Sequence, residues 1–296
     1  MKHLLDIKSL TKEEINQIYL RASEFEKGIR KSNHTNSHVV NMFFENSTRT
    51  KMSFEMAINK IHANKYDFLA EYSSLNKGED IYDTINNLCA IGMNIVVLRH
   101  KDNNLIYELS KKKYYQEISF INAGSGTSAH PSQALLDFYT IKKHFLDLDK
   151  KTITFVGDIA HSRVAKSNID LLKKFNMNIR CLTDDIFMGE KIEGVEYFTS
   201  LKEAFDNADI IMPLRIQKER IEEKINLEDY IKRFQITKEN LPYAAFLMHP
   251  GPINRDIEVK SDVLETQNAR TILNQSKNGV YVRMAILDMI LSSQGY

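Results

Sequence analysis

The chain has 296 residues, of which 43% are hydrophobic and 27% charged, and its formal net charge is +1. This length suits two domains with buried cores, and the near-neutral charge gives no long-range field for nucleic acid or an anionic membrane. No stretch approaches the ~20 apolar residues that cross a bilayer, and Asp6 precedes any apolar signal core. We therefore expect a cytoplasmic protein with no nucleic-acid or membrane partner, in which any anionic ligand is held by a local cluster of cations.

The two cysteines give no sign of metal or redox chemistry. Cys89 and Cys181 form no CxxC pair and have no histidine at zinc-ligand spacing. We interpret both as packed thiols and expect neither a metal site nor an organic cofactor.

Periodic patterns predict an α/β chain. Thr11 and Glu14 have capping-box spacing ahead of apolar residues at helical intervals, which indicates an amphipathic helix. Beyond it, apolar runs of strand length alternate with helical segments. The runs cover residues 39–44, 95–98, 118–121, 153–156, 210–212 and 244–248. This alternation is typical of parallel sheets joined by crossover helices.

The domain boundary is predicted near residues 146–151, a charged stretch that separates the helical segment 130–145 from the next strand. Near the end of the chain, Asn278 and Gly279 interrupt a helical pattern that then resumes. We expect two domains, residues 1–145 with 278–296 and residues 146–277, each with a parallel β-sheet flanked by helices. The C-terminal helix is expected to pack back on the first domain.

Polar residues follow the predicted strands of the first half. Ligands bind at the carboxyl ends of parallel strands, where loops and helix N-termini converge. Residues 47–50, Ser-Thr-Arg-Thr, stand where a strand turns into a helix, and their hydroxyls, amides and guanidinium suit a phosphate. The alternative is a capped helix with a solvated Arg49. Arg99, His130 and Gln133 follow the next two strands and could polarise a carbonyl oxygen, although each alone is as typical of packing or of the surface.

The second half does not have the pattern of a nucleotide-binding enzyme. Residues 157–163 read Gly-Asp-Ile-Ala-His-Ser-Arg rather than GxGxxG, and the chain has no GxxxxGK[ST] loop. A dehydrogenase and an ATPase are therefore disfavoured. Arg163 and Arg215 carry planar guanidinium groups that match carboxylates, which indicates a dicarboxylate ligand.

Together these motifs resemble the transcarbamylase family, and the resemblance runs nearly from end to end. Residues 44–50 with 53–55 are similar to its carbamoyl phosphate signature, and residues 130–133 with 135–137 to its second shared motif. Residues 157–164, 215–220 and 249–255 look like the aspartate branch, since no Cys follows His249 as in the His-Cys-Leu-Pro motif of ornithine enzymes. The resemblance implies an aspartate carbamoyltransferase of pyrimidine biosynthesis. The nearest alternatives are a transcarbamylase with another acceptor, such as ornithine, and a non-catalytic homologue.

The resemblance also implies roles for individual residues. Ser47, Thr48, Arg49 and Thr50 would hold the phosphate, while Thr50, Arg99 and His130 would polarise the carbamoyl oxygen. Gln133 and the carbonyls at Pro250 and Gly251 would orient the carbamoyl amine. Arg163, Arg215 and Gln217 would bind aspartate.

A loop from a neighbouring subunit is expected to complete each site, because family members share their sites across a homotrimer. Lys77 would reach both the phosphate and the aspartate, and Ser73 or Ser74 would reach the phosphate. From composition alone, the polar segment 73–79 would be predicted to be an ordinary surface loop. The sequence leaves open whether a regulatory chain or a dihydroorotase binds the trimer.

Two positions depart from the family pattern. Lys51 stands where the shared signature has a second Arg, and Asp80 stands where Thr is common. The first change keeps the charge but loses the planar fork, so Lys51 is left out of the predicted site.

Overall fold

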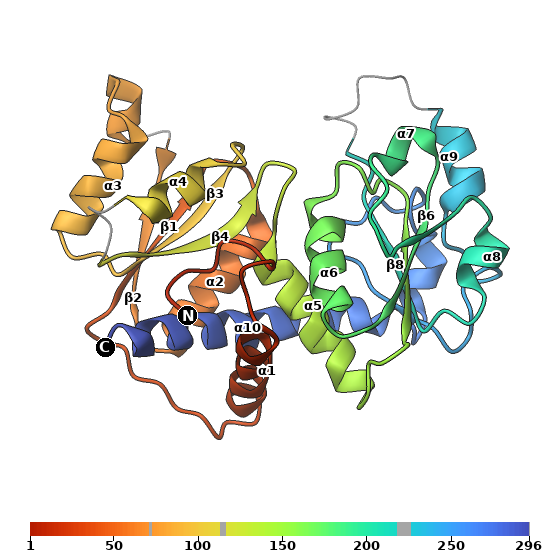
Figure 1. The fold of residues 1–296 in the computed structure, drawn as a ribbon, viewed down its shortest axis with the longest axis horizontal. Helices are drawn as coiled ribbons and strands as arrows, with labels where there is room; N and C mark the ends of the chain where they lie inside the picture. The colour runs from red at the N-terminus through yellow and green to blue at the C-terminus, as the bar shows by residue number, and fades with distance from the viewer. Residues whose placement is uncertain (71–72, 113–116, 218–225, 296) are drawn as a thin grey trace. The chain divides into compact units, whose positions relative to one another are not determined.

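Figure 1 shows a computed structural model of the chain, which describes residues 1–70, 73–112, 117–217 and 226–295. The chain divides into two compact units, here called the first unit (Met1–Leu136 with Ser276–Tyr296) and the second unit (Asp137–Gln275). The division falls within two helices, α5 (Pro131–His144) and α10 (Arg270–Ser293). Each unit is built on its own sheet.

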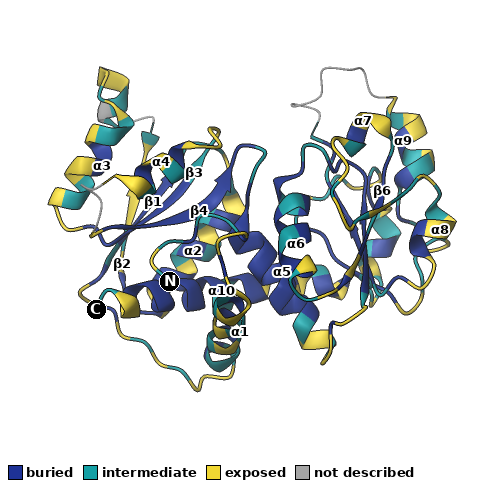
Figure 2. Cartoon of the chain, in the orientation of Figure 1, coloured by how far each residue is buried: buried dark blue, intermediate teal, exposed yellow. Residues whose placement is uncertain are grey.

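The first unit contains a four-stranded sheet in the order β2-β1-β3-β4, and every strand pair in it is parallel. Its strands are β1 (His38–Phe43), β2 (Asn64–Phe68), β3 (Ile95–His100) and β4 (Ser119–Ser125). The central strands are buried on both faces, whereas β2 is the partly exposed edge strand. Figure 2 shows this contrast. Burial on both faces explains why β1 and β3 appear in the sequence as continuous apolar runs.

Helices cover both faces of this sheet (Figure 1). On one face, α3 (Ile81–Ala90) and α4 (Leu105–Lys111) pack on the apolar side chains of β1, β3 and β4. On the opposite face lie α2 (Thr48–Lys60) and the part of α10 that belongs to the first unit, from Ser276 onward. A short 3-10 helix, η2 (Ser74–Lys77), precedes α3.

A buried carboxylate joins the chain's first and last helices within the first unit. Asp288 of α10 is 2% exposed and accepts hydrogen bonds from Arg21 of α1 (Lys12–Glu26) at 2.5 Å and from Ser32. The Nε2 atom of His34 lies 3.1 Å from the same carboxylate, and Arg30 lies 3.4 Å away. These donors hold the pKa of Asp288 at about 2, against the burial that would raise it.

The second unit contains a five-stranded sheet in the order β7-β6-β5-β8-β9, again with every pair parallel. Its strands are β5 (Thr152–Val156), β6 (Asn178–Leu182), β7 (Glu196–Phe198), β8 (Ile210–Pro213) and β9 (Phe246–Leu247). Strands β5 and β8 are fully buried and form the centre of the sheet. This places the loops that follow them side by side at one edge.

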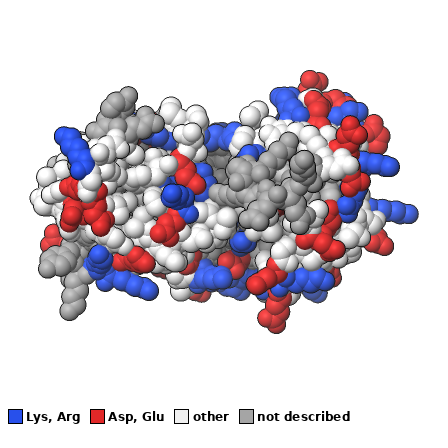
Figure 3. Space-filling view, turned by 90° about the horizontal axis from the view of Figure 1, so that it is seen from above, with Lys and Arg blue, Asp and Glu red and all other residues white. Residues whose placement is uncertain are grey.

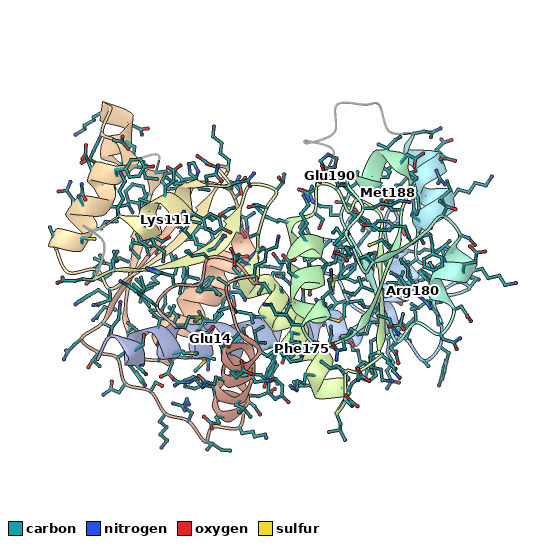
Figure 4. The ribbon with its side chains drawn as sticks, in the orientation of Figure 1. Glu14, Lys111, Phe175, Arg180, Met188 and Glu190 are labelled. Atoms are coloured by element: carbon teal, nitrogen blue, oxygen red, sulfur yellow. The ribbon has the colours of Figure 1, made fainter. Side chains whose placement is uncertain are left out.

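The core of the second unit is rich in aromatic rings. Its remaining helices are α6 (Arg163–Lys173), α7 (Asp185–Met188), α8 (Leu201–Phe205), α9 (Leu227–Phe234) and the 3-10 helix η5 (Ser261–Glu265). Residues from α7, α8, α9 and η5 pack on one face of the sheet, where Phe187 and Tyr230 meet edge to face at 5.5 Å. Elsewhere Phe138 of α5 packs on Phe175, labelled in Figure 4, with ring centroids 4.5 Å apart.

These observations confirm the predicted α/β class, with two parallel sheets flanked by helices and the C-terminal helix packed in the first unit. The capping box of α1 is also present: Thr11 accepts from the Glu14 amide at 3.1 Å, and Glu14 (labelled in Figure 4) accepts from the Thr11 amide at 3.0 Å. Helix α5 begins at Pro131, as its sequence indicates.

One element differs from its prediction at the C-terminus. Helix α10 runs without a break through Asn278 and Gly279, so the predicted interruption is wrong. Glycine is retained there because of close packing: a Cβ at position 279 would lie 2.6 Å from Nη1 of Arg283 and 3.1 Å from Cδ2 of Leu136. A small residue inside a helix can therefore mark a crowded contact rather than a turn.

The surface carries no strong field of one sign, at least on the face drawn in Figure 3, where Lys and Arg are interspersed with Asp and Glu. This agrees with the net charge of +1. Among the described residues, no helix is long and apolar enough to cross a membrane.

Candidate active site

The candidate phosphate site lies at the carboxyl edge of the first sheet, where the direction of chain progression changes. Strand β1 has β2 on one side and β3 on the other, so the connections from β1 and β3 leave in opposite directions. A crevice forms at such a switch point, and ligands bind there. The Ser-Thr-Arg-Thr segment follows β1, and Arg99 lies at the end of β3, paired in register with Phe43. The fold therefore brings together two candidate groups that are about 50 residues apart in sequence.

Helix α2 presents its N-terminus at this edge. Ser47 is the N-cap residue, but its side chain makes no capping hydrogen bond. Ser47 has a non-helical backbone conformation, and the first amides of any helix lack intrahelical partners. Thr48 and Arg49 are exposed, whereas Thr50 is buried. Desolvation by neighbouring atoms lowers the pKa of Arg49 although the residue is exposed, and Arg49 stays charged at neutral pH.

Arg99 is held in place by neighbouring strands. Its Nη1 donates to the carbonyl of Ala123 in β4 at 3.2 Å, and its Nε lies 3.5 Å from Glu45, in the loop that follows β1. Only 11% of its side chain is exposed. The guanidinium is thus fixed between three adjacent strand ends, as a donor aimed at a developing oxyanion must be.

His130 and Gln133 are positioned by a tight turn after β4. The Ser125 amide donates to the Ala129 carbonyl at 3.0 Å, and Oδ1 of Asn103 accepts from the amides of Thr127 and Ser128. The chain then enters α5, where His130 is 5% and Gln133 8% exposed. His130 caps the helix through its carbonyl, which accepts from the Gln133 amide at 3.0 Å. Both side chains therefore lie in the same first turn.

The two departures from the family pattern have local explanations. Lys51 lies 3.4 Å from Asp67 of β2 and 4.0 Å from Glu55, and Lys65 contacts the same two acids. The charge of Lys51 is therefore part of an ion-pair cluster between α2 and β2. Asp80 is the N-cap of α3 and accepts from the Tyr82 amide at 3.0 Å, a task that Thr performs as well.

Lys77 and Ser73 belong to the segment that leads from β2 to α3. Lys77 ends η2 and is exposed, whereas Ser73 donates its hydroxyl to the Ala70 carbonyl at 2.8 Å. An exposed lysine on a short 3-10 helix is available to a partner molecule. The side chain of Ser74 lies outside the described residues.

The second sheet has its own switch point, between β5 and β8, with β6 on the far side of β5. Arg163 is the first residue of α6, directly after β5 and its loop, and is 8% exposed. Ser162 caps this helix by accepting from the Ala165 amide at 3.1 Å. Arg215 and Gln217 follow β8 and are half-buried. Two guanidinium groups thus follow the central strands, as expected for a dicarboxylate site.

Two buried carboxylates hold the loop that carries Arg215 and Gln217. Asp158, which is fully buried, accepts from the Gln217 amide at 3.2 Å and from His161 at its amide and Nδ1. Glu258 is also fully buried and accepts from the Ile216 amide at 3.2 Å. The side-chain amide of Gln217 in turn donates to the His161 carbonyl at 2.9 Å.

The turn after β9 contains Pro250 and Gly251, both partly exposed. Its first residue, His249, donates its amide to Gln275 at 2.8 Å and accepts from the Gly251 amide through Nδ1 at 2.8 Å. Gln275 in turn donates to the buried Asp137 at 2.7 Å. The turn is therefore held by side chains rather than by a sheet ladder.

Our reading of the sequence overlooked Glu258 and Gln275. The segment around Glu258 reads Arg-Asp-Ile-Glu-Val-Lys, which looks like a solvated stretch, and nothing local signals burial. Three residues of the 215–220 motif, 218–220, lie outside the described residues. In the part of the chain that the structure describes, no group of three or more His, Cys, Asp or Glu is arranged to hold a metal ion.

Family models match nearly the whole chain. Residues 2–143 match "Aspartate/ornithine carbamoyltransferase, carbamoyl-P binding domain", and residues 149–290 match the "Asp/Orn binding domain" of the same family. The chain therefore belongs to the aspartate/ornithine carbamoyltransferase family, a family of transferases.

Relatives of similar sequence indicate the aspartate branch of this family. The aspartate carbamoyltransferase catalytic subunit of Fusobacterium nucleatum is 39% identical, with 98% of this chain and 96% of that protein covered. The subunit of the same name from Streptococcus equi subsp. zooepidemicus is 37% identical, with 99% and 96% covered.

Solved structures agree in fold over the full length. The catalytic subunit of M. Jannaschii aspartate transcarbamoylase superposes with a TM-score of 0.87 at 30% identity, covering 99% of both chains. Aspartate transcarbamoylase from Trypanosoma cruzi in complex with carbamoyl phosphate and aspartate has a TM-score of 0.84 at 25% identity, covering 97% of this chain and 94% of that one. The similarity favours the aspartate branch over the ornithine branch.

Proposed function

We propose that the chain transfers the carbamoyl group of carbamoyl phosphate to the amino group of L-aspartate, an early step of pyrimidine synthesis. The products are N-carbamoyl-L-aspartate and phosphate. The observation that carries the proposal is the pairing of Arg163 and Arg215 after the central strands β5 and β8 of the second sheet, since two planar cations suit the two carboxylates of aspartate. Ornithine has a cationic side chain, which these groups would repel.

The donor binds to residues of the first unit. The amides at the N-terminus of α2 and the side chains of Ser47, Thr48, Arg49 and Thr50 bind the phosphate. Arg99, His130 and Thr50 donate to the carbamoyl oxygen, which becomes most negative in the tetrahedral intermediate, so these donors favour the transition state over the substrate. The buried position of Thr50 and His130 strengthens these interactions by excluding water.

The acceptor binds to residues of the second unit. Arg163 and Arg215 bind the two carboxylates, and Gln217 assists. The carbamoyl amine of the donor is oriented by Gln133, which belongs to the first unit, and by the Pro250 and Gly251 carbonyls. The neutral amine of aspartate attacks the carbamoyl carbon, a C–N bond forms, and the C–O bond to phosphate breaks. The departing phosphate takes the proton of the amine. Orientation of the two reactants supplies most of the rate acceleration.

The two ligands divide the chain into functional domains. We assign carbamoyl phosphate to residues 1–145 with 278–296, and aspartate to residues 146–277. We further propose a homotrimer in which Lys77 and Ser73 of one subunit complete the site of the next. The exposure of Lys77 on η2 supports this role, because its ammonium is available outside its own chain.

The residue assignments are tested by separating the Michaelis constants of the two substrates. Arg215→Ala and Arg163→Ala should each raise the KM for aspartate by at least about 30-fold, as expected when a charge-assisted pair worth about 2 kcal/mol is lost. Their KM for carbamoyl phosphate should change by less than about threefold, and Arg49→Gln should show the reverse pattern. An unchanged KM for aspartate in both variants would remove these arginines from the site.

A further inference from the structure

Residues 214–217, which include Arg215 and Gln217, lie in no helix or strand. They follow β8, which ends at Pro213, and only the Leu214 amide continues the ladder, by donating to the Val156 carbonyl at 2.9 Å. Ile216, between the two proposed aspartate ligands, is 1% exposed. Its amide donates to the carboxylate of Glu258 at 3.2 Å.

Glu258 binds a second segment with the same carboxylate. Its Oε2 accepts from the Asn254 amide at 2.8 Å, and its Oε1 accepts from Nδ2 of Asn254 at 2.9 Å. Asn254 lies three residues beyond Gly251, in the turn that follows β9. One carboxylate therefore joins the loop that holds the aspartate ligands to the turn that holds Pro250 and Gly251.

The chemistry of this contact requires a carboxylate. Glu258 is fully buried, and an ionised group so far from water is tolerated only where donors compensate it. Three N–H groups point at its two oxygens, and burial still raises its pKa. A glutamine could accept at only one of its two terminal atoms, because the other is itself a donor. It would face either Ile216 or Asn254 with the wrong polarity.

We propose that Glu258 is a positioning residue for aspartate, which fixes the backbone between Arg215 and Gln217 and ties it to the turn at Pro250 and Gly251. This inference rests on the proposed role of Arg215 and Gln217 in binding aspartate. Glu258 itself touches no substrate. Its larger effect should appear in the binding of the acceptor, since it holds neither α2 nor the turn at His130 and reaches the donor only through the turn at Pro250 and Gly251.

The test compares Glu258→Gln with a matched variant in the same segment. Asp256→Asn is the control, because Asp256 is exposed and its carboxylate accepts only from the amide and hydroxyl of Ser261, both at 2.8 Å, among the bonds the structure gives it. We expect Glu258→Gln to raise the KM for aspartate at least about tenfold, since small displacements of an orienting group have effects of this size or more. The KM for carbamoyl phosphate should rise less than the KM for aspartate, because Glu258 reaches the donor only through the turn at Pro250 and Gly251, and Asp256→Asn should change neither.

A double variant separates positioning from a general loss of structure. If Glu258 acts through Arg215, adding Glu258→Gln to Arg215→Ala should change the KM for aspartate less than about twofold further. Where Glu258→Gln does not fold by circular dichroism, Asn254→Ala replaces it. That variant removes one donor and leaves the two backbone bonds, so the KM for aspartate should rise about threefold.

Each outcome bears on the inference. An unchanged KM for aspartate in folded Glu258→Gln, or in Asn254→Ala where the first variant does not fold, overturns it. An equal effect of Asp256→Asn, a parallel rise in the KM for carbamoyl phosphate, or full additivity with Arg215→Ala also overturns it. The proposed aspartate site fails separately, when Arg215→Ala alone leaves the KM for aspartate unchanged.

Discussion

Replacing Asp288 by asparagine should destabilise the protein by about 2–4 kcal/mol at pH 7. Asp288 is 2% exposed and its pKa falls from 3.8 to about 2, a difference of about 1.8 units. At about 1.36 kcal/mol per pKa unit, this corresponds to about 2 kcal/mol of folding free energy from the charged form. Asparagine also turns an amide group toward the donors Arg21, Ser32 and His34, which leaves at least one of them unsatisfied.

The pH dependence follows from the lowered pKa. The contribution is fully present above the unfolded pKa of about 4, and it disappears as the pH falls through the folded pKa of about 2. Urea unfolding at pH 7, 5, 4 and 3 would give the unfolding free energies. It can be followed by circular dichroism and by tyrosine fluorescence, because the chain has 13 Tyr and no Trp. The gap between wild type and Asp288→Asn should be equal at pH 7 and 5 and shrink only below about 4.

The control is Asp83→Asn, an exposed aspartate in the first turn of α3. It should cost no more than about 0.5 kcal/mol, through the helix dipole alone. A cost below about 0.5 kcal/mol for Asp288→Asn would refute the reasoning. So would a gap that closes between pH 7 and 5, because the group responsible would then titrate near neutrality.

Three further predictions concern the site and its frame. In steady-state kinetics, Lys51→Gln should change the KM for carbamoyl phosphate less than about threefold, whereas Arg49→Gln should raise it tenfold or more. The reason is that Lys51 is paired with Asp67, and such pairs contribute up to about 1 kcal/mol. A similar rise of this KM in both variants would place Lys51 on the phosphate. In urea unfolding, Gly157→Ala should lower the unfolding free energy by at least about 1 kcal/mol more than Gly194→Ala does. Both glycines have a positive φ, but only at position 157 would the added Cβ overlap the Tyr230 hydroxyl. Equal losses of unfolding free energy in the two variants would contradict the packing argument. Inactive Arg49→Ala and Lys77→Ala chains, dissociated and reassembled together, should regain part of the activity, and no recovery in the mixed assay would count against sites shared between subunits.

The fully buried strands could be predicted from sequence, and the partly exposed edge strands β2 and β7 could not. Strands β1, β3, β5 and β8 lie between two neighbours and carry continuous apolar runs, which fixes their location. Strand β2 reads Asn-Lys-Tyr-Asp-Phe and is half-exposed, so its pairing with β1 rather than its composition makes it a strand. Strand β7 has only three residues and is partly exposed, so it escaped for the same reason, and β9 is shorter than predicted because only two of its residues pair with β8.

The residues proposed to bind ligands were accessible to sequence reasoning because they follow strands. Arg99 and Arg215 come after the runs that form β3 and β8, so parallel pairing alone assigns them to the sheet edges. The groups that hold these residues were not accessible. Glu258 is 42 positions from Ile216, and its contact depends on how the turn after β9 folds. Such long-range bonds have no local signature in a single sequence.

The most direct measurement of the proposed activity is a competition between acceptors. The protein would be incubated with ¹³C-labelled carbamoyl phosphate and an equimolar mixture of L-aspartate and L-ornithine, and the labelled products followed by nuclear magnetic resonance alongside phosphate release. Arg163 and Arg215 suit a dicarboxylate, so we predict that the label appears in N-carbamoyl-L-aspartate, in one-to-one ratio with phosphate. Label transferred mainly to ornithine, or phosphate released without a carbamoylated amino acid, would contradict the account.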